Sequence, residues 1–516
     1  MTQVAERLGS TAREQASSRS WPVVTLSVVL SASSAAALAL VAGRLAAGPT
    51  PVLALLLPLA LLPVVLWKRP AAGLLLLLAG VVLVEQFGYQ VGPREGALTA
   101  RIPLFRSVAP GALVTPAEVL LAGVFIVWTL HCVRDRRRML HRTPLATRIF
   151  LLVAMAVFYF AFGVARGGDL AIAVFELRPF LFLLVAYVLA ASLLAHEKAV
   201  ATMLWIFVIG SAMKAVYGVL IFLSIRFVQP RPEAVLAHEE SFFFGVYVFL
   251  TIGAWLFGLQ GRLRTVATAL LPVVLLADMV NSRRTAWAIL IFGLLLLLAI
   301  AYRALPRRRH VLTRVTVVAA VLSAVYLPLF WNSGGTLAQP ARAVRSAVAP
   351  DARDEMSNEY RMLEDLNLEY NIRARSSTGS GFGIPIDYVV PIVDLTDIAS
   401  LIAYVPHNGL YWVWMRMGLF GQVLLWLVIA EALATCVRLA RQSRGQSALL
   451  GAVTACAVVG WVIMGETDYG LYWTRLMLCM GLLLGVVDGR LRAAQSSVEH
   501  VRPAAAPAGP LLRALT

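Results

Sequence analysis

The chain has 516 residues, of which 59% are hydrophobic and 14% are charged, and its mean hydropathy is +0.78. This composition lies far outside the range of soluble globular domains and indicates a polytopic membrane protein. The formal net charge of +17 does not indicate a nucleic-acid partner, because the basic residues cluster in short connectors between apolar segments, such as 134–138 and 307–310.

Apolar segments long enough to cross a bilayer, which takes about 20 residues, recur from Trp21 nearly to Asp488. The first resembles a signal peptide only superficially, because a second span follows at once, and we expect it to stay uncleaved. The sequence therefore predicts an all-α fold, a polytopic integral membrane helical bundle of about 14 transmembrane helices with one large outer loop. The predicted spans are 21–43, 50–67, 71–91, 115–133, 146–164, 178–196, 199–225, 241–259, 265–280, 285–303, 314–331, 408–435, 449–466 and 470–487.

The basic connectors predict how the bundle is oriented. If successive spans alternate in direction, these connectors share one face with both termini, and the positive-inside rule makes that face cytoplasmic. We expect a cytoplasmic tail at 1–20, a transmembrane domain at 21–490 and a disordered cytoplasmic tail at 491–516. The one sizeable extramembrane segment, 332–407, then forms the large loop on the outer side.

The outer segment has helix-like sequence at the start of 357–377 and an irregular stretch at 379–391 that opens with GSGFG. GSGFG lacks the strand and helix context of a nucleotide-binding loop, so it predicts a tight turn that needs glycine. The carboxylates of the segment show no metal-ligand spacing, and the four cysteines of the chain show no paired spacing, so no metal or cofactor is predicted. We expect the following carboxylates to lie on solvated helix faces: Asp351, Asp354, Glu355, Glu364 and Asp365.

Arginines at the outer ends of spans run against the positive-inside bias. Arg178 precedes a proline, which suits the first turn of a helix, and Arg283 and Arg284 precede the span at 285–303. Anchoring to lipid headgroups explains any one of them. Several together favour an anionic ligand, because guanidinium groups match phosphate oxygens in pairs. The outer segment adds Arg361, Arg373 and Arg375.

Charged residues inside spans cost about 2.5–3.5 kcal/mol each on insertion scales, so they need partners or a water-filled cavity. Arg416 lies eight residues after Asn408, and it either reaches the outer site or forms a buried structural ion pair. The other charged residues in spans are Glu85, Lys214, Asp278 and Arg475.

His407 and Asn408 stand where the outer segment re-enters the membrane, in the sequence YVPHNG. Asn408 suits the capping position of the next helix. A helix N-terminus favours anions and disfavours imidazolium, so we expect a neutral His407 that accepts a proton beside a phosphate. The alternative is an interfacial histidine with a structural role.

The spacing after this pair resembles the His-Asn signature of the bacterial O-antigen ligase and O-antigen polymerase family. Nine residues follow Asn408 before Gly418, and two more precede Gly421. The motifs ARGGDL, FELRPF, SRRTAW, SNEYR, GSGFG and PHN also agree in order. The resemblance covers roughly residues 115–490, and the spans before residue 115 lie outside it.

The resemblance implies a membrane glycosyltransferase, metal-independent and inverting. Its donor would be a polyprenyl (undecaprenyl) diphosphate-linked oligosaccharide and its acceptor a glycan or lipid. The protein would be a multi-pass component of the bacterial cytoplasmic (inner) membrane, embedded in the lipid bilayer, with its active site on the outer face.

The resemblance also implies roles for individual residues. His407 would activate the acceptor hydroxyl, and Arg361, with Arg283 or Arg284, would hold the diphosphate leaving group. The doubled arginine of SRRTAW departs from the more usual single arginine, so either of the two can carry this role. The predicted catalytic residues are His407 and Arg361, the predicted diphosphate-binding residues are Arg178, Arg283, Arg284 and Arg361, and the supporting residues are Asn408, Gly418 and Gly421.

The sequence leaves two alternatives open. A ligase and a polymerase differ in the acceptor, and the lack of a docking element for another macromolecule favours polymerase or exopolysaccharide-type transfer. A transporter or flippase for lipid-linked oligosaccharide would also suit the many helices and the outer arginines. Transporters more often place polar residues near the midplane in broken helices, whereas this chain has an outer segment of roughly 75 residues and a His-Asn pair at its end.

Overall fold

The structure is a computed structural model that describes most of residues 62–501. The predicted span 21–43, most of the span 50–67, the tail 1–20 and the end of the chain lie outside the described residues. Within 62–501 the residues that are not described are 63, 87–89, 92–93, 96–98, 100–101, 107–113, 137–138, 140–141, 226, 228–233 and 395–400.

The described residues are mostly helical, with an irregular stretch between α14 and α15 and a small antiparallel hairpin of β1 (Gln90–Val91) and β2 (Arg94–Glu95). Every predicted span from 71–91 onward overlaps one helix, although the helix in the span 71–91 already ends at Leu83. The helices are α4 (Pro70–Leu83), α5 (Pro116–Arg134), α6 (Pro144–Ala165), α7 (Leu170–Leu193), α8 (Glu197–Ile225), α9 (Glu240–Leu256), α10 (Arg262–Asn281), α11 (Arg284–Ala304), η3 (Pro306–Arg308), α12 (Arg309–Phe330), η4 (Thr336–Ala338), α13 (Gln339–Val348), α14 (Ala352–Ala374), α15 (Gly409–Gln442), α16 (Gly445–Thr467) and α17 (Thr474–Val501).

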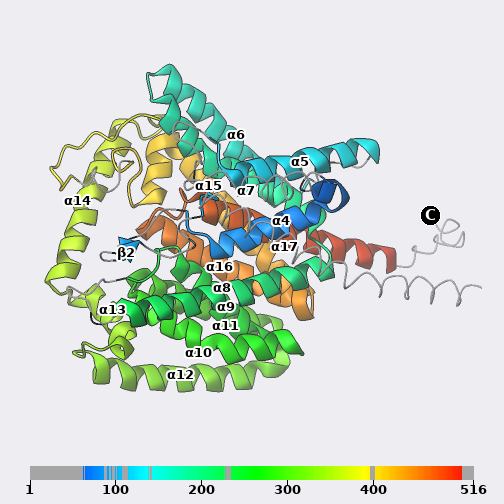
Figure 1. The fold of residues 1–516 in the computed structure, drawn as a ribbon, viewed down its shortest axis with the longest axis vertical. Coiled ribbons are helices and arrows are strands. Elements are labelled where there is room, and N and C mark those ends of the chain that lie inside the picture. The colour runs from blue at the N-terminus through cyan, green and yellow to red at the C-terminus, as the bar shows by residue number, and fades with distance from the viewer. Residues whose placement is uncertain are drawn as a thin grey trace, which may run out of the picture.

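Among the described residues, nine helices are long and apolar enough to cross a membrane, and α4 and α9 are apolar but shorter. The fold is thus a helical bundle suited to a bilayer. Figure 1 shows α8 to α12 as roughly parallel rods, with α12 at one edge and α14 standing across their ends. The total of 14 spans and the outer position of 332–407 stay predictions. α17 continues to Val501, past the predicted start of a disordered tail at 491.

Polar caps fix where several helices begin. Asp169 accepts a hydrogen bond from the Ile172 N–H at 2.9 Å and caps α7, which therefore starts eight residues before Arg178. The expectation that Arg178 lies in a first helical turn is wrong, because Pro179 lies inside α7. The polar residue was the stronger start signal, since its side chain satisfies an N–H that the helix leaves free.

Close backbone contact joins α7 to α17. A Cβ atom added at Gly481 would lie 2.5 Å from the Leu183 carbonyl oxygen, and one added at Gly485 would lie 2.3 Å from that of Tyr187. The two glycines are four residues apart and share one face of α17. Small residues at this spacing let membrane helices approach closely, so α17 packs along the buried side of α7.

The segment GSGFG inserts its backbone into a break in α15. Gly418 has φ of 62° and ψ of −170°, and a Cβ there would lie 2.3 Å from the Ser377 carbonyl oxygen. The N–H groups of Ser380 and Gly381 donate to the carbonyls of Met415 and Arg416 at 2.8 and 3.0 Å, which satisfies groups that the break would leave free. The segment is thus a tight glycine turn, as predicted, whereas the break in the span was not predicted.

A buried ion pair fastens this insertion to the bundle. Arg416 Nε donates to Glu176 Oε1 on α7 at 2.8 Å, and both side chains are fully buried. Arg416 also donates to the Tyr404 carbonyl at 2.7 Å, and Glu176 accepts from the Gly383 N–H. Of the two alternatives for Arg416, the structural ion pair is the one that forms.

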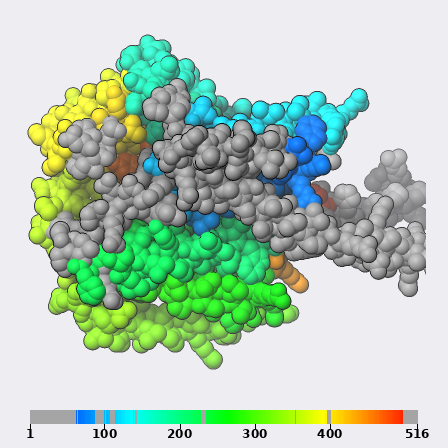
Figure 2. Space-filling model, viewed as in Figure 1, coloured from blue at the N-terminus to red at the C-terminus, as the bar shows by residue number. Residues whose placement is uncertain are grey.

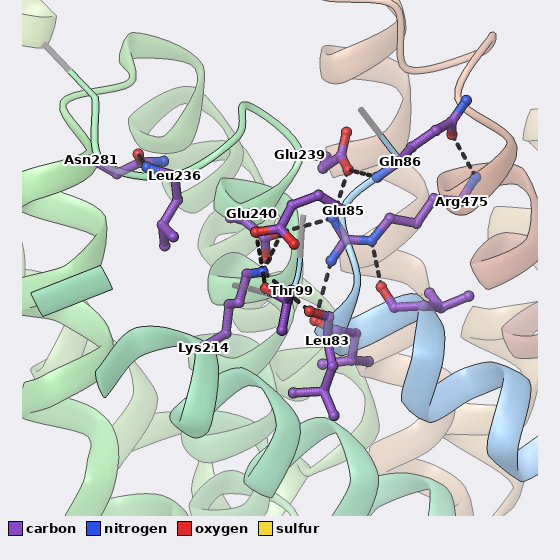
Figure 3. Close-up of polar contacts among 12 residues, drawn as sticks. Leu83, Glu85, Gln86, Thr99, Lys214, Leu236, Glu239, Glu240, Asn281 and Arg475 are labelled. Carbon is purple, nitrogen blue, oxygen red and sulfur yellow. Dashed lines mark hydrogen bonds and ion pairs between the residues drawn. The ribbon is translucent and has the colours of Figure 1, made fainter. Parts of the chain in front are cut away.

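The other charged residues predicted inside spans are also buried. Glu85, Lys214 and Arg475 belong to one network of charges (Figure 3), whose chemistry is treated below. Asp278 is buried in α10 beside Ser241 of α9. Each of them is therefore shielded from lipid by neighbouring helices, as intramembrane charges require.

Replacing Arg416 by methionine should destabilise the fold strongly. The substitution leaves Glu176 buried without its cation, and breaking a buried ion pair from one side typically costs about 3–5 kcal/mol. Urea titration of the purified protein in detergent measures the loss in the free energy of unfolding. Arg134→Met is the matched control, because Arg134 is exposed and pairs only with its neighbour Asp135 in the described residues. Equal stability of the two variants would contradict this account.

Candidate active site

Helix α14 packs against the beginning of α15. Helices α11 and α17 begin at the same end of the bundle. Figure 1 shows it crossing this end, and Figure 2 shows the outer surface of the same segment at the edge of the molecule. Asp351 caps it by accepting from the Asp354 N–H at 2.9 Å. The inner face of α14 therefore contacts residues at the start of these membrane helices.

The imidazole of His407 is held between a carboxylate and a phenol. Nδ1 lies 3.2 Å from both carboxylate oxygens of Glu364, and the His407 backbone N–H donates to Glu364 Oε2 at 3.0 Å. Nε2 lies 3.3 Å from the Tyr469 hydroxyl. Because an ionised carboxylate can only accept, Nδ1 carries a hydrogen and the lone pair of the neutral ring lies on Nε2.

Glu364 is 1% exposed, so the expectation that it lies on a solvated helix face is wrong. It shares the inner face of α14 with Leu368 and Ile372, each four residues further along. This stripe was a signal for a functional carboxylate, since a buried carboxylate needs a partner. Of the other four carboxylates, Asp351 and Glu355 are exposed, as expected, and Asp354 and Asp365 are partly buried.

Two tyrosines frame the imidazole. The ring centroid of His407 lies 4.7 Å from that of Tyr469 and 5.7 Å from that of Tyr360. Burial raises the pKa of both phenols, that of Tyr360 to about 12, so both stay protonated at neutral pH and can donate. The His407 side chain is 20% exposed, which leaves an edge open to a ligand. Sequence reasoning had not singled out either tyrosine.

Asn408 caps α15, as predicted, and its Oδ1 accepts from the Tyr411 N–H at 3.0 Å. Its Nδ2 group lies 3.2 Å from Asp365 Oδ1 and 3.4 Å from Glu466 Oε1. A single amide therefore ties α14 and α16 to the start of α15. Removing it would leave two carboxylates facing each other without a shared donor.

Arg361 lies three residues before Glu364 on α14 and is partly buried. Its charge acts on Asp468: burial opposes ionisation there, but His238 and, to a smaller extent, Arg361 lower the pKa of Asp468 below its usual value. His238 Nδ1 pairs directly with Asp468 Oδ2. Within the described part of the chain, Arg361 makes no ion pair within 4 Å, so its guanidinium has N–H groups for a ligand.

Arg284 connects α11 to α14. Its Nη1 donates to Asn358 Oδ1 at 2.9 Å, its Nη2 donates to Ser357 Oγ at 3.3 Å, and its Nε lies 3.7 Å from Asp354. These three residues and Arg361 fall on neighbouring turns of α14. Arg283 is the N-cap residue of α11 and also makes contacts. The structure thus brings Arg284 to the helix that carries Arg361.

Arg178 lies nearby but is engaged elsewhere. Its Nε forms an ion pair of 2.7 Å with Glu118 Oε1 at the start of α5, and its guanidinium lies over the Phe175 ring. Phe175 in turn packs against Tyr472, with ring centroids 5.1 Å apart. Arg178 therefore borders the turn that carries Tyr469, with its charge already partly matched by a carboxylate.

The two glycines of the predicted signature shape α15. Gly418 forms the break that accepts GSGFG, and a Cβ on Gly421 would lie 2.2 Å from the Met417 side chain. Arg373 pairs with Glu369 at the exposed side of α14. These residues therefore stand apart from the contacts that hold His407.

The sequence matches no model of a protein family and no curated protein. No group of three or more His, Cys, Asp or Glu side chains in the described residues could hold a metal ion. The arrangement at His407 combines a basic ring nitrogen with the buried carboxylate of Glu364. The guanidinium of Arg361 lies one turn from Glu364 on α14. Such a combination can take a proton from a hydroxyl and hold an anion next to it.

Asp365 should make stability depend on pH. Burial, with the neighbouring Glu364, Glu466 and Glu369, raises the pKa of Asp365 to about 6, although Asn408 lowers it. The unfolded chain releases this proton at a lower pH, so the folded state loses stability as pH rises from about 4 to about 6. Asp365→Asn should abolish this decline.

Thermal unfolding between pH 4 and pH 7 measures the effect of Asp365. The melting temperature of Asp365→Asn relative to the wild type should rise with pH. Asp351→Asn, at an exposed cap of the same helix, should show no such trend. A constant difference between Asp365→Asn and the wild type would contradict the assignment.

Proposed function

We propose that this chain is a membrane glycosyltransferase that moves a glycan from a polyprenyl diphosphate-linked donor to an acceptor hydroxyl, as an O-antigen or exopolysaccharide polymerase or ligase. The observation that carries the proposal is the His407–Glu364 pair at the start of α15, in which the carboxylate holds Nδ1 and the imidazole side chain stays 20% exposed. The resemblance of YVPHNG and the following glycines to the O-antigen ligase and polymerase family supports it.

In this proposal His407 is the general base. Nε2 takes the proton of the acceptor hydroxyl while the acceptor oxygen attacks the anomeric carbon of the donor sugar. The bond between that carbon and the diphosphate oxygen breaks, the diphosphate leaves with its negative charge, and attack from the opposite face inverts the anomeric centre. Glu364 stabilises the imidazolium that forms and keeps the ring oriented.

The arginines have separate tasks in the same step. Arg361 is the first choice for the diphosphate, because it makes no ion pair within 4 Å among the described residues and lies one turn from Glu364. Arg284 can contribute from α11. Its guanidinium donates to the neutral Asn358 side chain, and the carboxylate beside it, Asp354, is 3.7 Å away. Arg283 and Arg178 stay proposed contacts, and Arg178 is the weaker one because Glu118 pairs with it.

The surroundings of the reaction are proposed with it. The donor lipid would enter from the bilayer, and the site would lie on the outer face of a bacterial cytoplasmic membrane. Positioning, one proton transfer and matching of the leaving charge are sufficient for this chemistry, so the proposed mechanism uses no metal.

Incubation of the purified protein in nanodiscs with an undecaprenyl diphosphate-linked oligosaccharide, in the presence of a chelator, tests the proposal. We expect consumption of donor and release of undecaprenyl diphosphate. Longer glycans without an added acceptor would identify a polymerase, and transfer only to an added lipid acceptor would identify a ligase. In sealed proteoliposomes, which enclose a separate compartment, movement of intact donor across the bilayer without turnover would instead favour the transporter alternative.

Arg361→Lys should lower transfer although the charge is retained. A lysine ammonium is a point charge and cannot replace two parallel guanidinium contacts to phosphate oxygens. We expect a loss of about 10-fold or more in kcat/KM, corresponding to a loss of at least about 1.4 kcal/mol of transition-state stabilisation. The control is Arg373→Lys on the exposed side of the same helix, which should keep full activity. Equal activity of both variants would remove Arg361 from the site.

A further inference from the structure

A second cluster of charges lies buried where α4 ends and where α9 and α17 begin. Figure 3 shows Glu85, which follows α4, with Lys214 of α8 and with Glu239, Glu240 and Arg475 at the starts of α9 and α17. All five residues are at most 2% exposed. The cluster takes no part in the proposed transfer, and intramembrane charges that are kept buried usually have a function.

The two cations cap the C-terminal end of α4. Arg475 donates to the carbonyls of Val81 and Val82, the latter at 3.1 Å, and Lys214 donates to the Leu83 carbonyl at 3.1 Å. These carbonyls carry the negative end of the helix dipole and have no partner inside the helix. Both cations are therefore fixed by the fold, independently of the carboxylates.

The three carboxylates are not equally well matched. Arg475 Nη1 lies 2.7 Å from both Glu239 Oε1 and Glu240 Oε1, and the Gln86 N–H also donates to Glu239 Oε1 at 3.0 Å. Lys214 Nζ pairs with Glu85 Oε1 and lies 3.7 Å from Glu240 Oε1. Glu85 Oε2 and Glu240 Oε2 are buried without any hydrogen-bond partner in the described structure.

The charges of the described cluster do not balance. Three ionised glutamates facing two cations would leave one net negative charge in a buried site, which is costly. Two carboxylates that lie side by side each disfavour ionisation of the other. Burial raises the pKa of Glu239, and Glu240 raises it further, although Arg475 opposes both.

We propose that this cluster is a proton-binding site in which one proton resides on either the Glu85 or the Glu240 carboxyl. Both flank the same Lys214 ammonium and both have a free oxygen, so a hydrogen on either displaces no existing donor. Glu239 stays ionised, because its Oε1 already accepts from Arg475 and from a backbone N–H. With one proton bound, two carboxylates balance two cations.

A proton fits this cluster better than a metal ion. Hard cations such as Ca²⁺ take six to eight oxygen ligands, whereas only two carboxylate oxygens of this cluster are fully buried without a hydrogen-bond partner in the described residues. The same residues contain no cluster of three side chains suited to a metal. Thr99 Oγ1 is already engaged by Lys214 at 2.8 Å.

Two short segments connect this site to the candidate active site. Glu239 and Glu240 directly follow His238, which pairs with Asp468, and Arg475 follows the turn that holds Tyr469. Loss of the proton would place a negative charge next to the residues that position this turn. The inference itself stands on the buried cluster and does not depend on the proposed transferase activity.

Glutamate-to-glutamine variants of the full chain test the proposal, because glutamine has the shape of a protonated glutamate and no charge. Glu85→Gln and Glu240→Gln should each keep the wild-type melting temperature at neutral pH, since either leaves two carboxylates and two cations. The double variant, with one carboxylate too few, should melt several degrees lower. Glu176→Gln is the matched control and should also melt lower, because Glu176 balances Arg416 one to one.

Infrared difference spectra between the wild type and each variant give the second measurement. The wild type should show a carbonyl band of one protonated carboxylic acid. This band should be absent from Glu85→Gln and from Glu240→Gln, because each variant leaves two carboxylates for two cations. The proposal is overturned if no single variant removes such a band. It is equally overturned if sodium ions, rather than protons, raise the melting temperature of the wild type and fail to do so in Glu85→Gln.

Discussion

A buried carboxylate beside an imidazole is the contact on which the candidate active site depends. Glu364 accepts from the backbone N–H of His407 and faces its Nδ1, so it fixes both the position and the tautomer of the ring. Since Glu364 has almost no exposure to water, α14 cannot move away without leaving a charge unpaired. The contact between Glu364 and His407 therefore both holds α14 against the bundle and orients the imidazole.

The position of that contact is set by packing deeper in the bundle. The glycine turn enters the break at Gly418, and the Arg416–Glu176 pair fastens it to α7. These contacts fix the first turns of α15 and, with them, the Asn408 cap next to His407. A rigid support of this kind is what a general base needs, because small errors in position cost large factors in rate.

Local signals in the sequence predicted the parts of this arrangement that depend on neighbouring residues. The apolar runs predicted the helices, and Asn408 was predicted as a cap because its task involves only the next three residues. Glu364 and Glu176 were missed because their partners are 43 and 240 residues away. The break at Gly418 was missed for the same reason, since it exists to receive GSGFG, and Tyr469 reaches His407 only through the packing of α16 and α17.

The central claim, that His407 acts as a general base, is tested most directly by single-turnover transfer from an undecaprenyl diphosphate-linked oligosaccharide, measured together with donor binding. His407→Ala should bind donor with wild-type affinity and transfer about 10² to 10⁴ times more slowly, which is the usual contribution of a general base. Wild-type transfer by His407→Ala, or loss of donor binding by a variant that keeps its fold, would contradict the account.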